Sequence, residues 1–362
     1  MAAGVIFTSA VLYYLVGNIF FIGYNKSDKF FIIKEDEIMC TAITLKTEDF
    51  YFGRTLDMEY TYCEEVTVTP RNYEFSFKNG KKINNHFAII GMAYVLEDYP
   101  LYYDAVNEKG LCIAGLNFPD NAYFGEAVNG KDNVATYEFI PWLLSQCESV
   151  KCVREKLQNI NITNQAFNDS LPPATLHWIV SDKSDCITVE STKDGLFVYD
   201  NPVGVMTNNP IFPMHMQNLN NYMHLSPKEP ENNFSNKLSL YNFCKGLGAV
   251  GLPGDLSSPS RFVRASFVKS NSVSGDSEFE SVGQFFHIIG TVEQVRGACE
   301  LGDELYEITV YTSCCNADKG VYYYTTYNNH QITAVDMHKC NLQSAELYRY
   351  PLVTTEQIAF SN

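Results

Sequence analysis

The sequence predicts an α+β fold in which strands outnumber helices. Short apolar runs typical of strands recur along the chain after residue 39, and a few helix-like patterns are clustered among them. The chain has 362 residues, of which 46% are hydrophobic. It can therefore bury a large core, either as one layered domain or as two domains.

The strand-like runs fall into three groups. The first comprises residues 41–46, 50–53, 87–95 and 111–118. The second, residues 178–199, is interrupted by turns at 182–185 and 193–195 and is typical of a β-meander. The third covers residues 307–335 with a turn at 316–320. We expect these segments to form the sheets.

Three segments carry the pattern of helices. Apolar residues recur at i, i+3 and i+7 from Val150, which predicts a helix with one buried stripe. Ser258 followed by Pro259 is typical of an N-cap and the first helical residue, and this places Arg261 in a first turn. A third helix is expected over residues 283–295.

The charge of the chain excludes one class of partner. Lys and Arg number 26 against 42 Asp and Glu, the formal net charge is -16, and no basic run occurs. Duplex nucleic acid requires a basic surface, so no nucleic-acid partner is expected. An anionic substrate would need a locally placed arginine or helix N-terminus.

Eleven cysteines are scattered along the chain without a single C-x-x-C pair. This arrangement indicates neither a zinc site nor a disulfide framework. We expect buried thiols, a structural role for the adjacent Cys314 and Cys315, and a reducing compartment, which predicts the cytoplasm.

The beginning of the chain differs in character from the rest. Residues 5–22 are nearly all apolar, and no charged residue stands between Met1 and Lys26. Three interpretations remain open: an untranslated leader upstream of the true start, a membrane anchor or signal segment, and a structured N-terminal element. A membrane partner is expected only under the second.

A codon argument favours the first interpretation. Residues 34–36 can be encoded as AAG-GAG-GAU, a purine-rich ribosome-binding sequence a few nucleotides before the codon for Met39. We therefore expect residues 1–39 to lie outside the mature protein.

Common catalytic signatures are missing from the sequence. No G-x-S-x-G, Walker A, H-E-x-x-H or G-x-G-x-x-G motif occurs, which removes the usual hydrolase elbow, P-loop, zincin and dinucleotide-binding interpretations. Instead, M-C-T at residues 39–41 opens the first predicted strand, and F-G-R-T-L-D at residues 52–57 closes the next.

Cys40 would carry both a thiol and a free α-amine if Met39 were removed. The amine titrates near about 7.7–8.0 and a thiol near about 8.5, so the amine can accept the thiol proton after a modest shift. Nucleophile and base would then share one residue, and no histidine would be needed. The alternative is that Cys40 is one more buried thiol.

Further motifs follow in an order that resembles the choloylglycine hydrolase family, whose best-known members are bile salt hydrolases and penicillin V acylases. They are D-Y-P at 98–100, N-E-K-G-L at 107–111, A-G-L-N-F-P at 114–119, L-H-W at 176–178, T-N-N-P at 207–210, L-P-G-D at 252–255, S-R-F at 260–262 and Y-Y-Y-T-T-Y at 322–327. The resemblance runs from Met39 to about Leu352. It implies an N-terminal-nucleophile αββα four-layer sandwich formed by residues 40–362 as a single domain, commonly a homotetramer, with no metal and no other cofactor.

The resemblance assigns Cys40 as the nucleophile and places Arg54 and Asp57 beside it. A carboxylate can hold the α-amine, while a guanidinium lowers the pKa of the thiol and orders the carboxylate. Without Cys40, Arg54 and Asp57 would be interpreted as a surface ion pair.

Three more residues match catalytic positions of the family. The side chain of Asn208 and the backbone N–H of Asn117 match the donors to the oxyanion, a charge that arises only in the transition state. Arg261 matches the active-site arginine. For His177 and His215 we expect packed, hydrogen-bonded side chains, and for residues 322–327 strand packing.

Asn117 also distinguishes the branches of the family, because penicillin V acylases commonly carry Tyr at that place. Asn117, Leu56, Leu96 and Tyr103 match substrate-binding positions, and the last three can cover the hydrocarbon face of a steroid. The sequence departs from the family in Leu56, where Met is usual, and in F-P-M-H at residues 212–215, where F-D-W-H is common. The second change leaves the packing behind the TNNP turn open.

The predicted function is hydrolysis of the amide bond of glycine- and taurine-conjugated bile acids through an acyl-enzyme. Aminoacyl transfer at the same site, penicillin V acylase activity and cleavage of acyl-homoserine lactones are alternatives. A rival of another class retains residues 1–38 as an anchor. Cys40 would then be internal, and the protein a catalytically silent, membrane-tethered binder.

Overall fold

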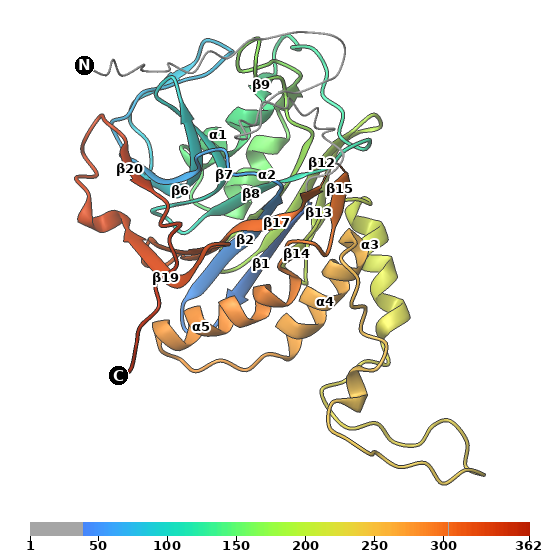
Figure 1. Ribbon diagram of the computed structural model, residues 1–362. Coiled ribbons are helices and arrows are strands. Elements are labelled where there is room, and N and C mark those ends of the chain that lie inside the picture. The colour runs from blue at the N-terminus through green and yellow to red at the C-terminus, as the bar shows by residue number, and fades with distance from the viewer. Residues whose placement is uncertain (1–38, 303) are drawn as a thin grey trace.

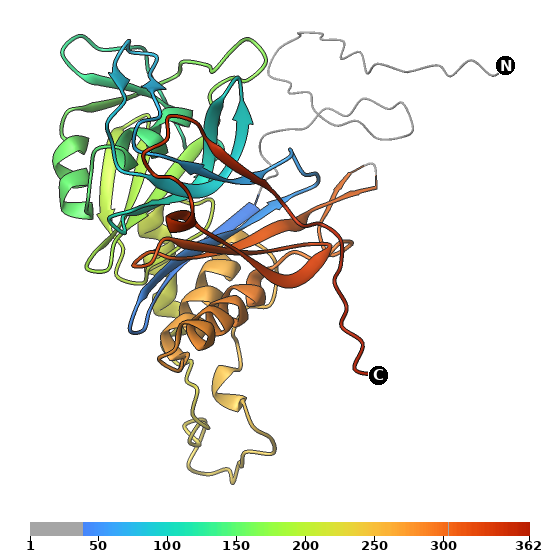
Figure 2. The same cartoon turned by 90° about the vertical axis from the view of Figure 1, so that its left-hand side faces the viewer.

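The computed structural model describes residues 39–302 and 304–362, so the apolar segment of the sequence lies outside the described residues. The described chain forms four layers: helices, a six-stranded sheet, an eight-stranded sheet and a second group of helices (Figures 1 and 2). The expected αββα sandwich is confirmed.

The six-stranded sheet is antiparallel throughout and contains the first hairpin of the described chain. Its strands, in spatial order, are β14 (Val205–Met206), β1 (Met39–Lys46), β2 (Phe50–Met58), β17 (Ile308–Asn316), β18 (Val321–Thr326) and β19 (Asn329–Asp336).

The eight-stranded sheet contains the predicted meander at one edge. Its order is β13 (Gly195–Asp200), β12 (Cys186–Thr192), β11 (Leu176–Ser181), β8 (Cys112–Asn117), β7 (Tyr99–Asn107), β6 (Ile89–Leu96), β3 (Glu65–Thr69) and β20 (Tyr348–Pro351). Three two-stranded sheets pair β4 (Phe75–Ser76) with β5 (Lys82–Ile83), β9 (Asp132–Ala135) with β10 (Ile160–Thr163), and β15 (Glu300–Gly302) with β16 (Leu305–Tyr306).

Helices cover the outer face of each large sheet. They are α1 (Phe139–Leu144), α2 (Val150–Leu157), α3 (Phe212–Asn218), α4 (Ser258–Asn271) and α5 (Glu278–Ile289). Short 3₁₀ turns add η2 (Thr136–Glu138), η3 (Leu219–Tyr222), η4 (Leu247–Ala249), η5 (Gly290–Val292) and η6 (Met337–Lys339).

Two helix predictions need correction. The N-cap of α4 is Ser257, one residue before the predicted cap, although Arg261 still closes the first turn by donating its N–H to the Ser257 carbonyl at 2.9 Å. The third helix begins at Glu278, five residues before the predicted start, and ends at Ile289 rather than at residue 295. A capping box formed by Ser277 and Glu280 fixes its start.

Strand boundaries were underestimated where polar residues are buried. β2 runs through the whole F-G-R-T-L-D motif to Met58, five residues beyond the strand-like run predicted over residues 50–53, and all of its residues are buried, Arg54 and Asp57 included. β7 was not among the predicted strands; its Pro100 lies opposite Val95 near the beginning of the strand.

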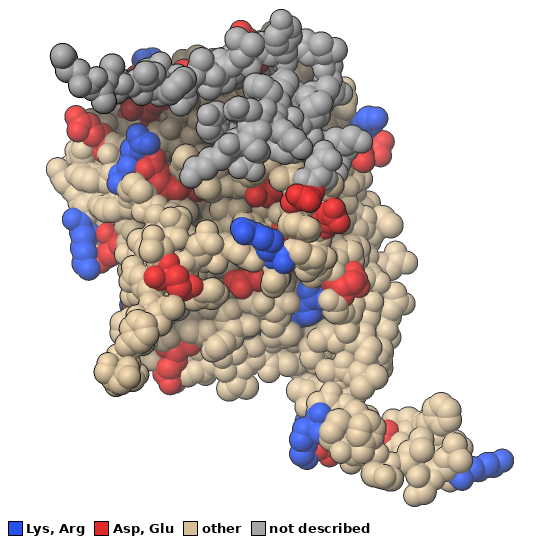
Figure 3. Space-filling model, in the orientation of Figure 1, with Lys and Arg blue, Asp and Glu red and all other residues tan. Residues whose placement is uncertain are grey.

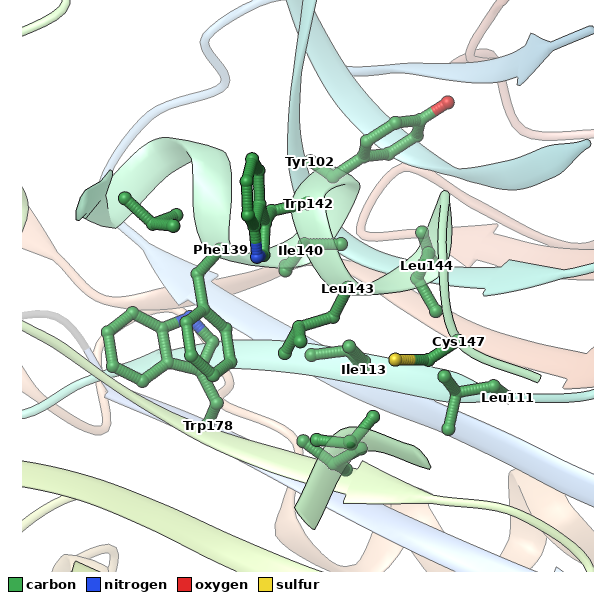
Figure 4. Close-up of a cluster of buried hydrophobic side chains, with 14 of the residues drawn as sticks. Tyr102, Leu111, Ile113, Phe139, Ile140, Trp142, Leu143, Leu144, Cys147 and Trp178 are labelled. Atoms are coloured by element: carbon green, nitrogen blue, oxygen red, sulfur yellow. The ribbon is translucent and has the colours of Figure 1, made fainter. Parts of the chain in front are cut away.

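Three apolar cores hold the layers together. The first lies between the eight-stranded sheet and α1 and α2, the second between the two sheets, and the third between the six-stranded sheet and α3, α4 and α5. Figure 4 shows part of the first core, where the rings of Phe139 and Trp178 stack with centroids 4.2 Å apart.

All eleven cysteines, which fall within the described residues, are free of disulfides. The prediction of buried thiols is wrong for Cys63 and Cys244, which are exposed. Cys314 and Cys315 are buried on opposite faces of β17, one in the third core and one in the second.

The surface of the described chain has one large projection. Residues 223–250, which we call the arm, extend away from the helical layer in Figures 1 and 2 and carry several exposed apolar side chains. On the face drawn in Figure 3, Lys and Arg lie interspersed with Asp and Glu. Within residues 39–302 and 304–362, no helix combines the length and apolarity needed to cross a membrane.

Candidate active site

The hairpin of β1 and β2 determines where the predicted site residues point. Cys40 pairs with Leu56 and Met39 with Asp57 in antiparallel register. Because side chains alternate between faces along a strand, Cys40, Arg54 and Leu56 point toward the eight-stranded sheet. Asp57 points toward the helical layer. Arg54 and Asp57 therefore both lie beside Cys40, but their side chains are on opposite faces of the hairpin.

Arg54 is buried between the two sheets and contacts the thiol of Cys40 directly through Nη2. Its Nη1 donates to the carbonyl oxygens of Gly115 and Tyr103 on the opposite sheet, and its Nε donates to the carbonyl of Thr55 at 3.0 Å. These hydrogen bonds fix the guanidinium plane against the sulfur.

Burial raises the pKa of the Cys40 thiol, and the positive charge of Arg54 opposes this effect. The thiol is therefore the resting form of a fully buried side chain, and a base is required to produce the nucleophilic thiolate. Arg54 stabilises that thiolate once it forms.

Asp57 is fully buried and accepts hydrogen bonds from the hydroxyls of Thr55 at 3.0 Å and Thr309 at 2.7 Å. Burial raises the pKa of this carboxyl to about 6, against the effects of Arg261 and of both hydroxyls. Asp57 therefore carries a negative charge at neutral pH, next to the strand position that precedes Cys40.

Asn208 connects the nucleophile with two other predicted residues. Its Oδ1 accepts the backbone N–H of Cys40 and Nη2 of Arg261, both at 2.8 Å. Its Nδ2 donates to the carbonyl of Asn117, also at 2.8 Å. Two donors on Oδ1 fix the orientation of the amide, so that Nδ2 faces β8.

The loop that carries Asn208 is held on both sides. Asn209 Nδ2 donates to the Pro119 carbonyl at 2.8 Å, and the Asn208 carbonyl lies 2.9 Å from Nε2 of His215. The ring of His215 stacks on Phe262 with a centroid distance of 4.7 Å. His215 and Phe262 thus supply the packing behind the TNNP turn that the altered F-P-M-H motif left open.

Arg261 is buried in the first turn of α4 and points toward the start of β1. Its Nη1 donates to the Cys40 carbonyl and to the Thr41 hydroxyl, both at 2.6 Å, and its Nε donates to the Leu256 carbonyl at 3.0 Å. The guanidinium therefore holds the backbone of the nucleophile itself.

The four residues matched to substrate binding do not all lie together. Leu56 is buried in the core between the sheets, and the half-buried Tyr103 packs against the same core. Asn117 ends β8, where its Oδ1 accepts the Thr175 hydroxyl at 2.9 Å. Leu96 is half-buried at the end of β6 and is not part of that core.

Neither histidine near the site has the environment of a base. His177 lies between Glu190 and the carbonyl of Thr207, 2.8 Å from its Nε2. Burial lowers the pKa of His215 to about 4, so this ring stays neutral. Both are packed, hydrogen-bonded side chains, as predicted.

The described residues contain no group of three or more His, Cys, Asp or Glu side chains placed to hold a metal ion.

Two buried carboxylates near the site were not predicted. Asp104 on β7 accepts hydrogen bonds from Tyr311 and Tyr322 at 2.7 Å each and faces Arg54 between the sheets. Glu307, just before β17, accepts the backbone N–H of Met39 at 2.7 Å. Single acidic residues in strand-like runs give no signal in the sequence, because their role depends on pairing between distant strands.

Residues 40–350 match the linear amide C–N hydrolases. The matching family within that class is the choloylglycine hydrolase family, and the protein belongs to it, as its motifs predicted.

Two relatives match this chain over nearly their whole length. The bile salt hydrolase/transferase of Lactiplantibacillus plantarum is 52% identical over 319 residues, which cover 88% of this chain and 98% of the relative. The bile salt hydrolase/transferase of Clostridium perfringens is 41% identical over 330 residues, covering 90% of this chain and 100% of the relative.

Solved structures agree with the fold. A crystal structure of a variant conjugated bile acid hydrolase from Clostridium perfringens has a TM-score of 0.83 at 38% identity and covers 89% of this chain and 100% of its own. A penicillin V acylase from Agrobacterium tumefaciens, with a TM-score of 0.68 and 20% identity over 86% of this chain and 90% of its own, shares the fold.

Proposed function

We propose that this protein hydrolyses the amide bond of glycine- and taurine-conjugated bile acids, with Cys40 as an N-terminal nucleophile. The observation that carries the proposal is the Cys40 thiol in contact with Arg54, with its backbone held by Asn208 and Arg261. The similarity to the bile salt hydrolase/transferases of Lactiplantibacillus plantarum and Clostridium perfringens supports the substrate class.

The first half of the reaction forms an acyl-enzyme. The α-amine of Cys40 takes the thiol proton, and the sulfur attacks the amide carbon of the substrate. The resulting oxyanion receives hydrogen bonds from Asn208 Nδ2 and the backbone N–H of Asn117. The C–N bond then breaks, and the α-ammonium returns its proton to the departing glycine or taurine nitrogen.

Water completes the cycle. It gives a proton to the α-amine as its oxygen attacks the thioester carbon, and the C–S bond breaks to release the bile acid and restore the thiol. An amino acid that attacks the same thioester through its nitrogen would instead form a new amide. The word transferase in the relatives' names favours this second activity.

Release of glycine from glycocholate, taurine from taurocholate and phenoxyacetate from penicillin V tests the substrate class. We expect turnover of at least one conjugated bile acid to exceed that of penicillin V, and Cys40→Ala to abolish all three activities. Faster turnover of penicillin V than of every conjugated bile acid would refute the bile acid proposal. Activity in Cys40→Ala would refute the nucleophile.

The mechanism requires a free nitrogen on Cys40, so we propose that residues 1–39 are not part of the mature enzyme and that residues 40–362 form one domain. An amide nitrogen cannot accept the thiol proton. Intact mass of the active protein reports its first residue directly. Active protein that retains residue 39 would refute this requirement, whereas inactive protein that retains the segment would favour the membrane-tethered alternative.

We further propose a homotetramer in the cytoplasm. The arm exposes Met223, Phe234, Tyr241 and Phe243 at 78–83% of their surface, an apolar area that a second copy of the chain could cover. The absence of disulfides among eleven cysteines supports a reducing compartment. Native mass spectrometry of the wild type and of Phe234→Ser with Phe243→Ser tests the assembly, since the double variant should dissociate.

A further inference from the structure

Glu307 is a buried acidic residue that binds the backbone nitrogen of Met39, the residue before the nucleophile. It is fully buried, and its Oε1 accepts the N–H of Met39 at 2.7 Å. The thiol of Cys299 also interacts with this carboxyl group, and no cation forms an ion pair with it in the described part of the chain. The mechanism above gives Glu307 no role, although a buried carboxylate is costly to maintain.

The charges on this face of the six-stranded sheet do not balance. Asp57 and Glu307 contribute two carboxylates, and Arg261 contributes one guanidinium that acts on both. Arg261 directs its hydrogen bonds to oxygen atoms of uncharged groups, at Cys40, Thr41, Asn208 and Leu256. While residue 39 is attached, the Cys40 nitrogen is a neutral amide, so only one cation is available for two carboxyl groups.

The imbalance is visible in both carboxyl groups. Burial raises the pKa of Glu307 to about 8, with a further contribution from Asp57, and that of Asp57 to about 6. A cation placed between them would stabilise both in their ionised forms.

We propose that Glu307 is a positioning residue for the α-amine of Cys40, accepting a hydrogen bond from it once residue 39 is gone. This inference rests on the proposed function, because it requires a mature chain that begins at Cys40. The new α-ammonium is the missing cation, and with it the two carboxylates are matched by two positive charges.

The distances allow this exchange of partners. Consecutive backbone nitrogens in an extended strand lie at most about 3.6 Å apart. Since Met39 N is 2.7 Å from Glu307 Oε1, the Cys40 nitrogen lies within roughly 6.3 Å of the same oxygen. A change in the Glu307 rotamer, or a single bridging water, spans that gap.

Charged groups approach the amine from both faces of the sheet. Asp57 faces it from β2 and Arg261 from α4, and the thiol of Cys299 lies beside Glu307. Arg54 approaches from the opposite face of the sheet, next to the sulfur. Of these groups, Asp57 and Glu307 favour the protonated amine, and the two arginines oppose it.

The proposal makes a specific prediction for the pH dependence of kcat/KM. The amine acts as a base, so the rate rises as it loses its proton with increasing pH. Glu307→Gln removes a negative charge at a distance of roughly 6 Å, which lowers the amine pKa. The acid limb of the profile should therefore move to lower pH by roughly one to two units.

The test uses glycocholate hydrolysis by the wild type, Glu307→Gln, the conservative Glu307→Asp and the control Glu138→Gln. Glu138 is also a buried glutamate, but it accepts the N–H groups of Lys78 and Ala135 beside α1, away from the hairpin of β1 and β2. We expect the acid limb to shift in Glu307→Gln, to stay close to the wild type in Glu307→Asp and to be unchanged in Glu138→Gln. Intact mass and thermal unfolding accompany each profile.

Two outcomes would overturn the inference. One is an acid limb that does not move in a folded Glu307→Gln protein beginning at Cys40. The other is a Glu307→Gln protein that keeps residue 39, because the carboxylate would then act before the amine exists. If instead the wild type turns over no conjugated bile acid, the proposed function itself has failed.

Discussion

Asn208 offers the sharpest test of how the site stabilises the transition state. Replacing it with Asp preserves its shape and an oxygen that accepts the Arg261 and Cys40 N–H groups, but it removes the Nδ2 donor. Loss of one oxyanion donor typically lowers kcat by about 10²–10³-fold, or about 2.7–4 kcal/mol. We expect a loss of at least this size in Asn208→Asp, with little change in KM, since the donor acts on charge that arises in the transition state.

Asn208→Ala separates this effect from structural damage. It leaves two buried donors without their acceptor, each of which costs about 1–3 kcal/mol of stability. We therefore expect Asn208→Ala to be less stable than Asn208→Asp, although both lose the oxyanion donor. Urea unfolding at neutral pH measures this difference, and glycine release from glycocholate measures kcat.

A matched control lies nearby in the chain. Asn201 is also buried, donates to Thr188 and to the Val205 carbonyl, and accepts the N–H of Gly204. Asn201→Asp makes the same chemical change outside the site and should keep its kcat. If Asn208→Asp retains more than a tenth of the wild-type kcat while remaining folded, Asn208 does not stabilise the oxyanion.

Three further predictions concern stability. Since burial raises the pKa of Asp57 from 3.8 to about 6 while residue 39 is attached, the stability of Asp57→Asn relative to its parent, both retaining residue 39, should fall by roughly 2 kcal/mol between pH 7 and pH 4 in urea titrations. A constant difference would contradict the assignment. Asp104→Asn leaves one of the Tyr311 and Tyr322 hydroxyls without its carboxylate acceptor and should lower the free energy of unfolding by about 1–3 kcal/mol, measured by urea unfolding; unchanged stability would show that the two hydroxyls find other acceptors. Phe139→Ala opens a cavity in the first core and should cost about 3–5 kcal/mol in the same assay, while a loss below 1 kcal/mol would mean that the core closes around it.

The sequence predicted the elements that local patterns control. The meander of β11–β13 and the first helical turn of α4 follow from turn chemistry and capping, which involve neighbouring residues. The strand-like run predicted for β2 stops at Gly53 because Arg54 and Asp57 interrupt the apolar pattern, and only contacts with distant segments make the burial of these two residues possible. Those contacts include the Gly115 carbonyl for Arg54 and the Thr309 hydroxyl for Asp57.

The motifs brought the site residues together as a set but could not say on which face of the sheet each one lies. Arg54 and Asp57 are three positions apart, and in a β-strand such residues point to opposite faces. A surface ion pair between them is therefore excluded by the geometry of the described strand. No sequence pattern indicated Glu307 or Asp104 as site residues. Their hydrogen-bond partners, Met39 for Glu307 and Tyr311 for Asp104, lie far away along the chain and are brought close only by strand pairing.

The sulfur and the nitrogen of Cys40 contact different groups, which lie on opposite faces of the six-stranded sheet. On the inner face, the sulfur meets Arg54, whose charge is balanced by the buried Asp104. On the helical face, Asp57, Glu307 and Arg261 lie around the beginning of the same strand. A residue at the start of a strand can reach both environments, because its side chain points to one face while its nitrogen lies at the strand end. A nucleophile placed in the middle of β1 would have the arginine but no amine, and this is the physical reason that the mechanism requires the chain to begin at Cys40.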